Sequence, residues 1–234
     1  MEIQKIIEKN RKAVVLIDLQ KPLENGQKQI SIRGTGFIIS EEGKFVTNAH
    51  VYKQIPEAEL QYIGVSVPGQ TDEKKNLTHY NRYKTKLLKL DEENDLALMQ
   101  IEGEGAKFST VNKIGNAEKV VEGDEVAYIG YPLATEMLNM GFGITMTTNH
   151  CMISSIKRRG SDGSLHFFLV DTHTNNGSSG SPVFSTQTGE VIGIVSGKIS
   201  SKIPAQNGQL MDIPANIGIC RPANYIENLF KVTE

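Results

Sequence analysis

A serine flanked by glycines is the feature of this sequence best suited to chemistry. Residues 175–184 read NNGSSGSPVF, with Gly177 two residues before Ser179 and Gly180 directly after it. Glycines so close to a serine predict a sharp bend, because residues with a Cβ would clash there. Such a bend exposes the hydroxyl and aims the amides of Gly177 and Ser179 at one point, so Gly177, Ser178 and Ser179 form a candidate oxyanion hole. A flexible Gly/Ser turn is the alternative, and the motif alone favours it.

A serine hydroxyl is a weak nucleophile and needs a general base that an acid holds in place. His50 is a candidate base, because histidine is suited to moving a proton near neutral pH. Asp95 is a candidate acid, directly after the polar turn 91–94. Taken singly, His50 could be a structural histidine at a strand end, and Asp95 could merely end the turn. Together the three residues follow the order His, Asp, Ser, which is one of the known orders of a catalytic triad.

The segments around these residues predict strands that would position them. Residues 34–40 and 44–50 are two apolar runs around a Glu-Gly turn, so we predict a hairpin with His50 at the end of its second strand. Residues 96–101 alternate along a third strand that starts just after Asp95. The spacing of the three candidate residues leaves room for one small barrel followed by most of a second.

The chain resembles the trypsin-like serine proteases of the HtrA/Deg branch, and the resemblance runs from about residue 13 to residue 229. The family usually has Asn or Asp where Ser178 stands and often a second glycine where Ser181 stands, but neither change touches the nucleophile or the two amide donors. The peptide-binding PDZ domain that many HtrA relatives carry has no counterpart in this chain. Five segments carry the resemblance in the family's order: VTNAHV at 46–51, NDLAL at 94–98, IGYP at 129–132, the serine loop at 170–182 and IGICRPAN at 217–224.

The resemblance implies an all-β fold of two antiparallel six-stranded barrels, with the site in the cleft between them. Residues 1–234 would form a single trypsin-like peptidase domain. The first barrel would take about 13–103 and the second about 118–221, with a closing helix over 222–230. A short amphipathic helix is predicted at residues 2–10, because isoleucines there recur at helical spacing.

The resemblance also implies a pocket for the residue that precedes the scissile bond. No carboxylate lies at its floor, so a lysine or arginine would be buried unpaired. We therefore expect a medium-sized aliphatic or uncharged polar residue there, with an acidic residue as the second choice. The implied lining residues are His173 and Thr174 at the floor, Val195, Ser196 and Gly197 along one wall, and Gly218 behind.

Composition sets wide limits on possible partners. The 234 residues carry a net charge of −2, with no long block of one sign. The basic run 157–159 is predicted to be a solvated loop, so neither a nucleic acid nor a membrane partner is implied. No stretch approaches the roughly 18 apolar residues that a membrane-spanning helix needs. The histidines and cysteines lack metal-ligand spacing, so we expect no metal and no cofactor.

Two features of the sequence concern location and assembly. Cys151 and Cys220 lie within apparent strands, so we expect two buried thiols without a bridge, which is typical of a reducing compartment. The N-terminus lacks the apolar core of a signal peptide, and the two observations together predict a cytoplasmic protein. Residues 1–12 contain no aromatic side chain, whereas HtrA trimer contacts use aromatic residues of that segment. We therefore expect a monomer.

The function that these residues indicate is a serine endopeptidase acting on protein or peptide substrates. His50 would take the proton of Ser179 as it attacks a peptide carbonyl, Asp95 would hold the imidazole, and water would release the acyl-enzyme. The alternative is a peptide-binding or holdase-type protein that uses the same fold without cleaving its ligand. Reaction of Ser179 with a serine-directed reagent would discriminate between the two.

Overall fold

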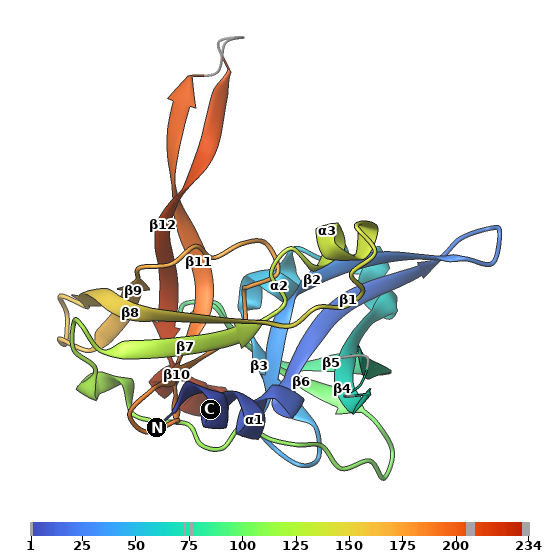
Figure 1. Cartoon of the computed structure of the whole chain (residues 1–234), viewed down its shortest axis with the longest axis horizontal. Coiled ribbons are helices and arrows are strands. Elements are labelled where there is room, and N and C mark those ends of the chain that lie inside the picture. The colour runs from blue at the N-terminus through green and yellow to red at the C-terminus, as the bar shows by residue number, and fades with distance from the viewer. Residues whose placement is uncertain (1, 73, 75–76, 205–208, 231–234) are drawn as a thin grey trace.

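Two closed six-stranded β-barrels lie side by side in the computed structural model (Figure 1), which describes residues 2–72, 74, 77–204 and 209–230. This confirms the expected all-β fold. All the strand pairs within the barrels are antiparallel. The first barrel closes in the order β1-β2-β3-β6-β5-β4 and the second in the order β10-β11-β12-β9-β8-β7. Their strands are β1 (Val14–Pro22), β2 (Lys28–Ile38), β3 (Lys44–Thr47), β4 (Ile63–Asp72), β5 (Leu77–Asp91), β6 (Leu96–Glu102), β7 (Glu125–Gly130), β8 (Thr147–Arg158), β9 (Leu165–Val170), β10 (Pro182–Ser185), β11 (Val191–Pro204) and β12 (Leu210–Pro222).

A continuous apolar core joins the two barrels. The larger cluster of buried side chains contains Phe37 and Phe45 of the first barrel together with Tyr131 and Phe184, which belong to the second half of the chain. A smaller cluster around Phe168 fills the second barrel alone. Burial of apolar surface at this junction fixes how the barrels sit against each other, and so fixes the residues that meet between them.

Short helices flank the barrels, and two differ from the prediction. The N-terminal helix α1 (Ile3–Asn10) is confirmed, and Ile6 is buried in the larger core. The strand before His50 ends at Thr47, so His50 lies in the first turn of α2 (Ala49–Lys53) instead of in the strand. The closing helix is the 3₁₀ helix η4 (Ala223–Phe230). The other helices are η1 (Arg11–Ala13), η2 (Glu57–Tyr62), η3 (Ala117–Lys119) and α3 (Ala134–Asn139). None of the helices in the described residues is long and apolar enough to cross a bilayer.

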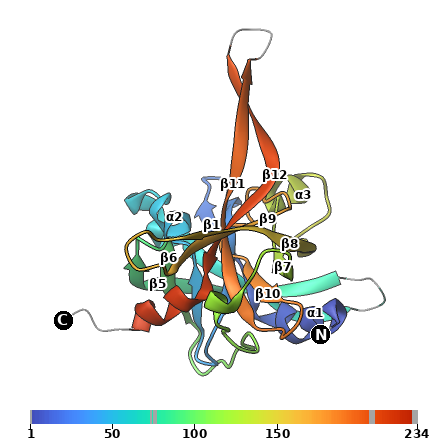
Figure 2. The ribbon, with the colours of Figure 1, turned by 90° about the vertical axis from the view of Figure 1, so that its left-hand side faces the viewer.

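The outer parts of β11 and β12 form a long hairpin that projects from the second barrel (Figures 1 and 2). The two strands stay paired from Gly193 and Pro222 in the barrel to Pro204 and Leu210 near the tip. The hairpin rises well above the rest of the molecule in both views. Its inner end belongs to the barrel wall beside the serine loop.

Candidate active site

His50 and Asp95 are brought together by α2 and by the turn before β6. The Nδ1 atom of His50 lies 3.0 and 2.9 Å from the two carboxylate oxygens of Asp95. The backbone amide of His50 also donates to Asp95 Oδ1 at 3.0 Å. A carboxylate that accepts from both the amide and the ring of one histidine fixes the orientation of the imidazole, leaving Nε2 as the ring nitrogen that can exchange a proton with a nucleophile.

The backbone of Asp95 adopts an unusual conformation that its surroundings hold in place. Its φ is +56°, a left-handed value that non-glycine residues rarely adopt. The side-chain amide of Asn48 donates to the Asp95 carbonyl at 3.0 Å. The neighbouring Asn94 side chain donates to Asp91 at 2.7 Å and accepts from Arg159 at 2.8 Å. Contacts on both sides of the turn thus hold this strained backbone conformation in place.

The carboxylate of Asp95 also bonds to the second barrel. Ser196 of β11 donates its hydroxyl to Asp95 Oδ2 at 2.5 Å. Burial raises the pKa of Asp95, but the hydrogen bonds from the His50 ring, the Ser196 hydroxyl and the His50 amide outweigh burial and hold the pKa below its usual value. Asp95 is therefore ionised at neutral pH, as an acid that stabilises an imidazolium must be.

The serine loop is shaped by its glycines, as the sequence predicts. Gly177 and Gly180 have φ values of +91° and +88°. A Cβ on Gly177 would lie 2.2 Å from the Tyr131 carbonyl oxygen, and one on Gly180 would lie 1.9 Å from the Thr35 carbonyl oxygen. Any side chain at these positions would displace backbone, so the bend around Ser179 requires glycine at both.

The peptide groups of the serine loop leave two amides available. The carbonyl of Asn176 accepts from the Leu133 amide at 2.7 Å, and in a trans peptide the N–H of Gly177 then points the opposite way. The amide of Ser178 donates to the Asn175 carbonyl at 2.9 Å, so this amide is already used. Within the described part of the chain, no hydrogen bond is donated by the amides of Gly177 or Ser179. These two amides can therefore serve an incoming oxyanion.

Ser179 is partly exposed, whereas its neighbour Ser178 is fully buried. The Ser178 hydroxyl accepts from the Asn175 amide at 3.2 Å, which is a structural role. No hydrogen bond between Ser179 Oγ and His50 is present among the described residues. Contacts of this kind are often loose in a ligand-free site and tighten when substrate binds.

A small cavity of about 180 Å³ lies beside Ser179. Three of the residues expected to form the substrate pocket line it, namely Thr174, Val195 and Gly197, and Thr174 donates to the Gly197 carbonyl at 2.7 Å. Ser196 turns toward Asp95 instead. Of the other two expected residues, His173 is exposed and contributes its carbonyl to the Tyr128 hydroxyl, while Gly218 packs directly behind Thr174. The remaining lining residues are Asn175, Asn176, Ser178, Ser179 and Lys198.

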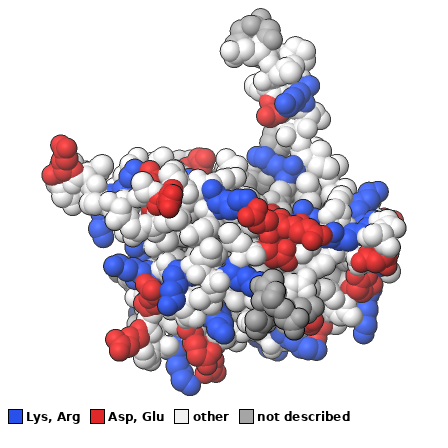
Figure 3. Space-filling model, turned by 180° about the vertical axis from the view of Figure 1, so that it is seen from behind, with Lys and Arg blue, Asp and Glu red and all other residues white. Residues whose placement is uncertain are grey.

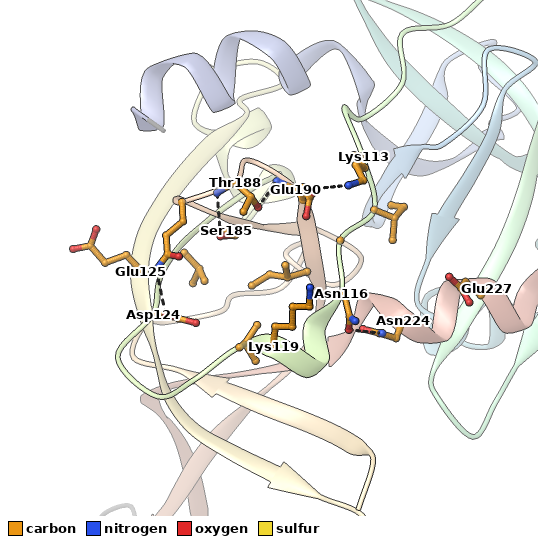
Figure 4. Close-up of a pocket in the computed structure, with 16 residues that line it drawn as sticks. Lys113, Asn116, Lys119, Asp124, Glu125, Ser185, Thr188, Glu190, Asn224 and Glu227 are labelled. Atoms are coloured by element: carbon orange, nitrogen blue, oxygen red, sulfur yellow. Dashed lines mark hydrogen bonds and ion pairs between the residues drawn. The ribbon is translucent and has the colours of Figure 1, made fainter.

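A larger hollow, of about 490 Å³, lies on the second barrel (Figure 4). Its polar side chains largely bond to one another, as in the ion pair of 2.6 Å between Lys113 and Glu190 and the hydrogen bond of 2.9 Å between Asn224 and Asn116. None of the candidate triad residues lines it. The hollow is therefore separate from the candidate triad.

Three side chains that shape this site were not predicted from the sequence. Ser196 was expected in a pocket wall but bonds to Asp95, 101 residues away in the chain. Thr35 of β2 donates to the Gly177 carbonyl at 2.7 Å, which ties the first barrel to the serine loop. Arg159 was expected in a solvated loop, yet its guanidinium bonds to Asn94 and Glu93 beside Asp95. No local pattern marks such contacts, because each joins segments that only the folded chain brings together.

Comparison with known proteins agrees with the fold and the sequence motifs. Residues 34–194 match the family described as trypsin-like peptidase domain. A probable periplasmic serine endoprotease DegP-like protein of Marinomonas sp. (strain MWYL1) is 32% identical over 195 residues, which are 83% of this chain and 34% of that protein. Serine protease HTRA3 of Homo sapiens is 30% identical over 208 residues, or 86% of this chain and 41% of that protein. The expected resemblance to HtrA proteases is confirmed.

A solved structure, titled HtrA-type protease AlgW with decapeptide, shares the fold. Its TM-score is 0.67 at 19% identity, and the match covers 98% of this chain and 68% of that chain. The chain spans about a third of the length of the DegP-like relative and about two fifths of HTRA3.

The expected cytoplasmic location is wrong, because relatives of this chain are named as periplasmic proteases, in Pseudomonas fluorescens as well as in Marinomonas. The two cysteines are free and buried, as expected. Burial raises the pKa of Cys151 to about 12 and that of Cys220 well above its usual value. Because thiol reactivity depends on an accessible thiolate, these buried thiols have low reactivity and do not distinguish one compartment from another.

Proposed function

The chain belongs to the trypsin-like peptidase family, and we propose that it is a serine endopeptidase that hydrolyses peptide bonds in proteins. The observation that carries the proposal is a hydrogen-bonded connection between the His50–Asp95 pair and the second barrel. The His50–Asp95 pair of the first barrel is bonded through Ser196 to the barrel that carries Ser179. The glycine bend leaves two amides beside that serine without a partner in the described residues.

The proposed mechanism assigns one task to each group. His50 takes the proton of Ser179 as Oγ attacks the peptide carbonyl, and Asp95 stabilises the imidazolium that results. The amides of Gly177 and Ser179 bind the oxyanion of the tetrahedral intermediate. His50 then gives its proton to the leaving amine, and water hydrolyses the acyl-enzyme by the same route. The catalytic groups in each step are side chains and backbone amides of this chain, and water is the second reactant.

The cavity beside Ser179 supports a preference for uncharged residues before the cut. No Asp or Glu lines it, so a lysine or arginine side chain would lose its hydration without gaining a partner. Its size and the buried Thr174 and Val195 suit a medium-sized aliphatic or small polar side chain. An acidic residue, which the Thr174 hydroxyl and the Lys198 ammonium could pair with, is the second choice.

The location and assembly of the protein are part of the proposal. Because relatives of this chain are named as periplasmic, we extend an extracytoplasmic location to it. The monomeric state stays a prediction, based on the lack of aromatic side chains in residues 1–12.

Digestion of a peptide library by purified variants tests the proposal. Ser179→Ala should abolish cleavage and keep the fold, because this partly exposed hydroxyl contributes little to packing. Ser178→Ala is the matched control and should retain substantial activity, since its hydroxyl only accepts a bond from the Asn175 amide. The reverse pattern would place the nucleophile one residue away. Strong cleavage after lysine or arginine would contradict the proposed preference of the pocket but not the proposed protease activity.

A further inference from the structure

Strand β2 contains a β-bulge close to the serine loop. Two successive residues of β1 pair with Gly34 and Ile32, so Arg33 between them is the extra residue of the bulge. Bulges are common next to active sites, where they re-aim a side chain that a regular strand would direct elsewhere. The direction and the partners of the Arg33 side chain therefore bear on what the site can bind.

At this point β2 packs against both the nucleophile and the helix of His50. A Cβ on Gly34 would lie 3.0 Å from the Ser179 carbonyl oxygen and 3.0 Å from a methyl carbon of Val51, which follows His50 in α2. Residues 34–38 of β2 are buried, whereas residues 31–33 are half-buried. Arg33 is therefore the first residue outside the buried junction of β2, α2 and the serine loop.

The leaving half of a substrate is expected on this side of the site. The cavity for the residue before the scissile bond is lined by residues between 174 and 198, all from the second barrel. The leaving amine must lie at His50, which protonates it. His50 belongs to the first barrel, where α2 packs on β2 through Val51 and Gly34. The chain that follows the scissile bond should therefore cross α2 and β2 and pass Arg33.

The guanidinium of Arg33 is poorly paired. Its Nη2 lies 3.8 Å from Glu59 Oε2, beyond hydrogen-bond range, whereas Lys21 donates to Glu59 Oε1 at 2.7 Å. Its Nε is buried and has no partner among the described residues. Two cations thus share one carboxylate, and one positive charge is left over. An added acceptor would recover the free energy that a buried, unpaired donor costs.

The carboxylate of the neighbouring strand is already used by another arginine. Asp18 of β1 is buried and accepts from Arg82 at 2.6 Å and from Ser66 at 2.9 Å. Arg82 also donates to the Tyr62 carbonyl at 2.8 Å. Arg82 is thus held by partners within the first barrel, whereas Arg33 keeps donors for a ligand.

Long-range charge does not account for a preference between acidic and basic substrates. Basic and acidic side chains are interleaved over both barrels on the face that Figure 3 shows, and the net charge of the chain is −2. A preference for acidic substrates would therefore have to come from a short-range contact such as one with Arg33.

We propose that Arg33 makes the protease selective for an acidic side chain among the first three residues after the scissile bond. This inference rests on the proposed function, which it deepens. Arg33 lies one residue from the contact of Gly34 with Ser179, and three extended substrate residues span roughly 10 Å. The planar fork of an arginine donates two parallel hydrogen bonds to a carboxylate, so an Asp or Glu side chain is the ligand that it fits.

Peptides that differ by one side chain test the inference. All share the residues before the scissile bond, and each carries Asp or the nearly isosteric Asn at one of the first five positions after it. We expect kcat/KM to be about fivefold higher for Asp than for Asn at one of the first three positions, as for a partly exposed ion pair. Asp and Asn should be equivalent at the fourth and fifth positions. The preference should weaken between about 0.05 M and about 1 M salt, because salt screens exposed charges.

Four variants separate the contact from general electrostatics. Arg33→Gln should remove the difference between Asp and Asn peptides, and Arg33→Lys should retain only part of it because the fork is lost. Lys28→Gln is the matched control: it removes the same charge from an exposed position of the same strand and should keep the preference. Glu59→Gln should enlarge the preference, since it removes the carboxylate that the two cations share. Denaturant titration of each variant checks its fold independently of activity.

Calorimetry with Ser179→Ala protein gives a readout that needs no cleavage. The Asp peptide should bind about fivefold more tightly than the Asn peptide, and adding Arg33→Gln should abolish the difference. Equal kcat/KM and equal affinity for Asp and Asn at every position would overturn the inference. So would a preference that survives Arg33→Gln, or one that Lys28→Gln removes equally. Acid-selective binding by a protein that cleaves no peptide would refute the proposed hydrolysis and still support recognition by Arg33.

Discussion

Asp95 is the residue on which the contacts of the site converge. It receives the ring and the amide of His50, the hydroxyl of Ser196 and, at its carbonyl, the amide of Asn48. The order His, Asp, Ser predicted its involvement, because a triad is recognisable by residue types and order. The bond from Ser196 and the left-handed backbone could not be predicted, since both depend on a turn geometry that no local pattern encodes.

The substitution Ser196→Ala tests the role of this convergence. It removes one donor, so the pKa of Asp95 should rise toward 3.8 and the imidazole should be held less firmly. At pH 7 the free energy of unfolding should fall by about 1.5 kcal/mol, the lower end for a hydrogen bond to a charged group. Because the pKa of Asp95 is lower in the folded than in the unfolded protein, its ionised carboxylate stabilises the fold at pH values above the unfolded-state pKa. This stabilisation is lost as the pH falls through the folded-state pKa.

Denaturant titrations of wild type and variant at several pH values measure this difference in unfolding free energy. The difference between the two proteins should shrink as the pH falls below about 3.8 and through the lowered folded-state pKa of Asp95. The kcat of the variant should fall at pH 7 while its KM changes little. A stability difference of equal size at pH 7 and pH 3 would mean that Ser196 contributes packing alone.

At the scale of elements, strand β2 fixes the position of the serine loop. The Thr35 amide donates to the Ser179 carbonyl at 2.8 Å, and the Thr35 hydroxyl donates to the Gly177 carbonyl and accepts from the Tyr131 amide at 3.1 Å. The strands themselves could be predicted from apolar runs and turns. The ends of the strands could not be predicted as well. The helix α2, which contains His50, begins at Ala49, inside an apolar run whose pattern predicts a single strand.

Thr35→Val keeps the shape of this buried side chain and removes its hydroxyl. The Gly177 carbonyl and the Tyr131 amide would each lose a partner, at a cost of about 1–3 kcal/mol in unfolding free energy. The kcat should fall about tenfold, because the amides proposed to bind the oxyanion would be held less firmly. Thr35→Ser is the control and should restore the unfolding free energy and the kcat of the wild type. Equal kcat values for the valine and serine variants would show that the loop does not depend on this strand.

At the scale of the whole molecule, the two barrels act as one unit. A shared core that includes Tyr131 and Phe184 joins them, and Tyr131 donates its hydroxyl to the Val14 carbonyl at 3.1 Å. The two-barrel architecture could be predicted because five motifs occur in a recognisable order. The projecting hairpin could not, since residues 199–213 lack the apolar alternation of a barrel strand. The location of the protein could not be predicted from its cysteines either, because buried thiols have low reactivity in reducing and oxidising compartments alike.

The most direct measurement of the central claim is the reaction of the native protein with a serine-directed phosphonate, followed by mapping of the modified peptide. A serine activated by His50 and Asp95 should be labelled at Ser179 alone, and His50→Ala should abolish the labelling although the serine remains. Ser178→Ala should be labelled like wild type, and unfolded protein should not react. An unmodified Ser179 in the native protein, or equal labelling of the His50→Ala variant, would contradict the assignment of an activated nucleophile.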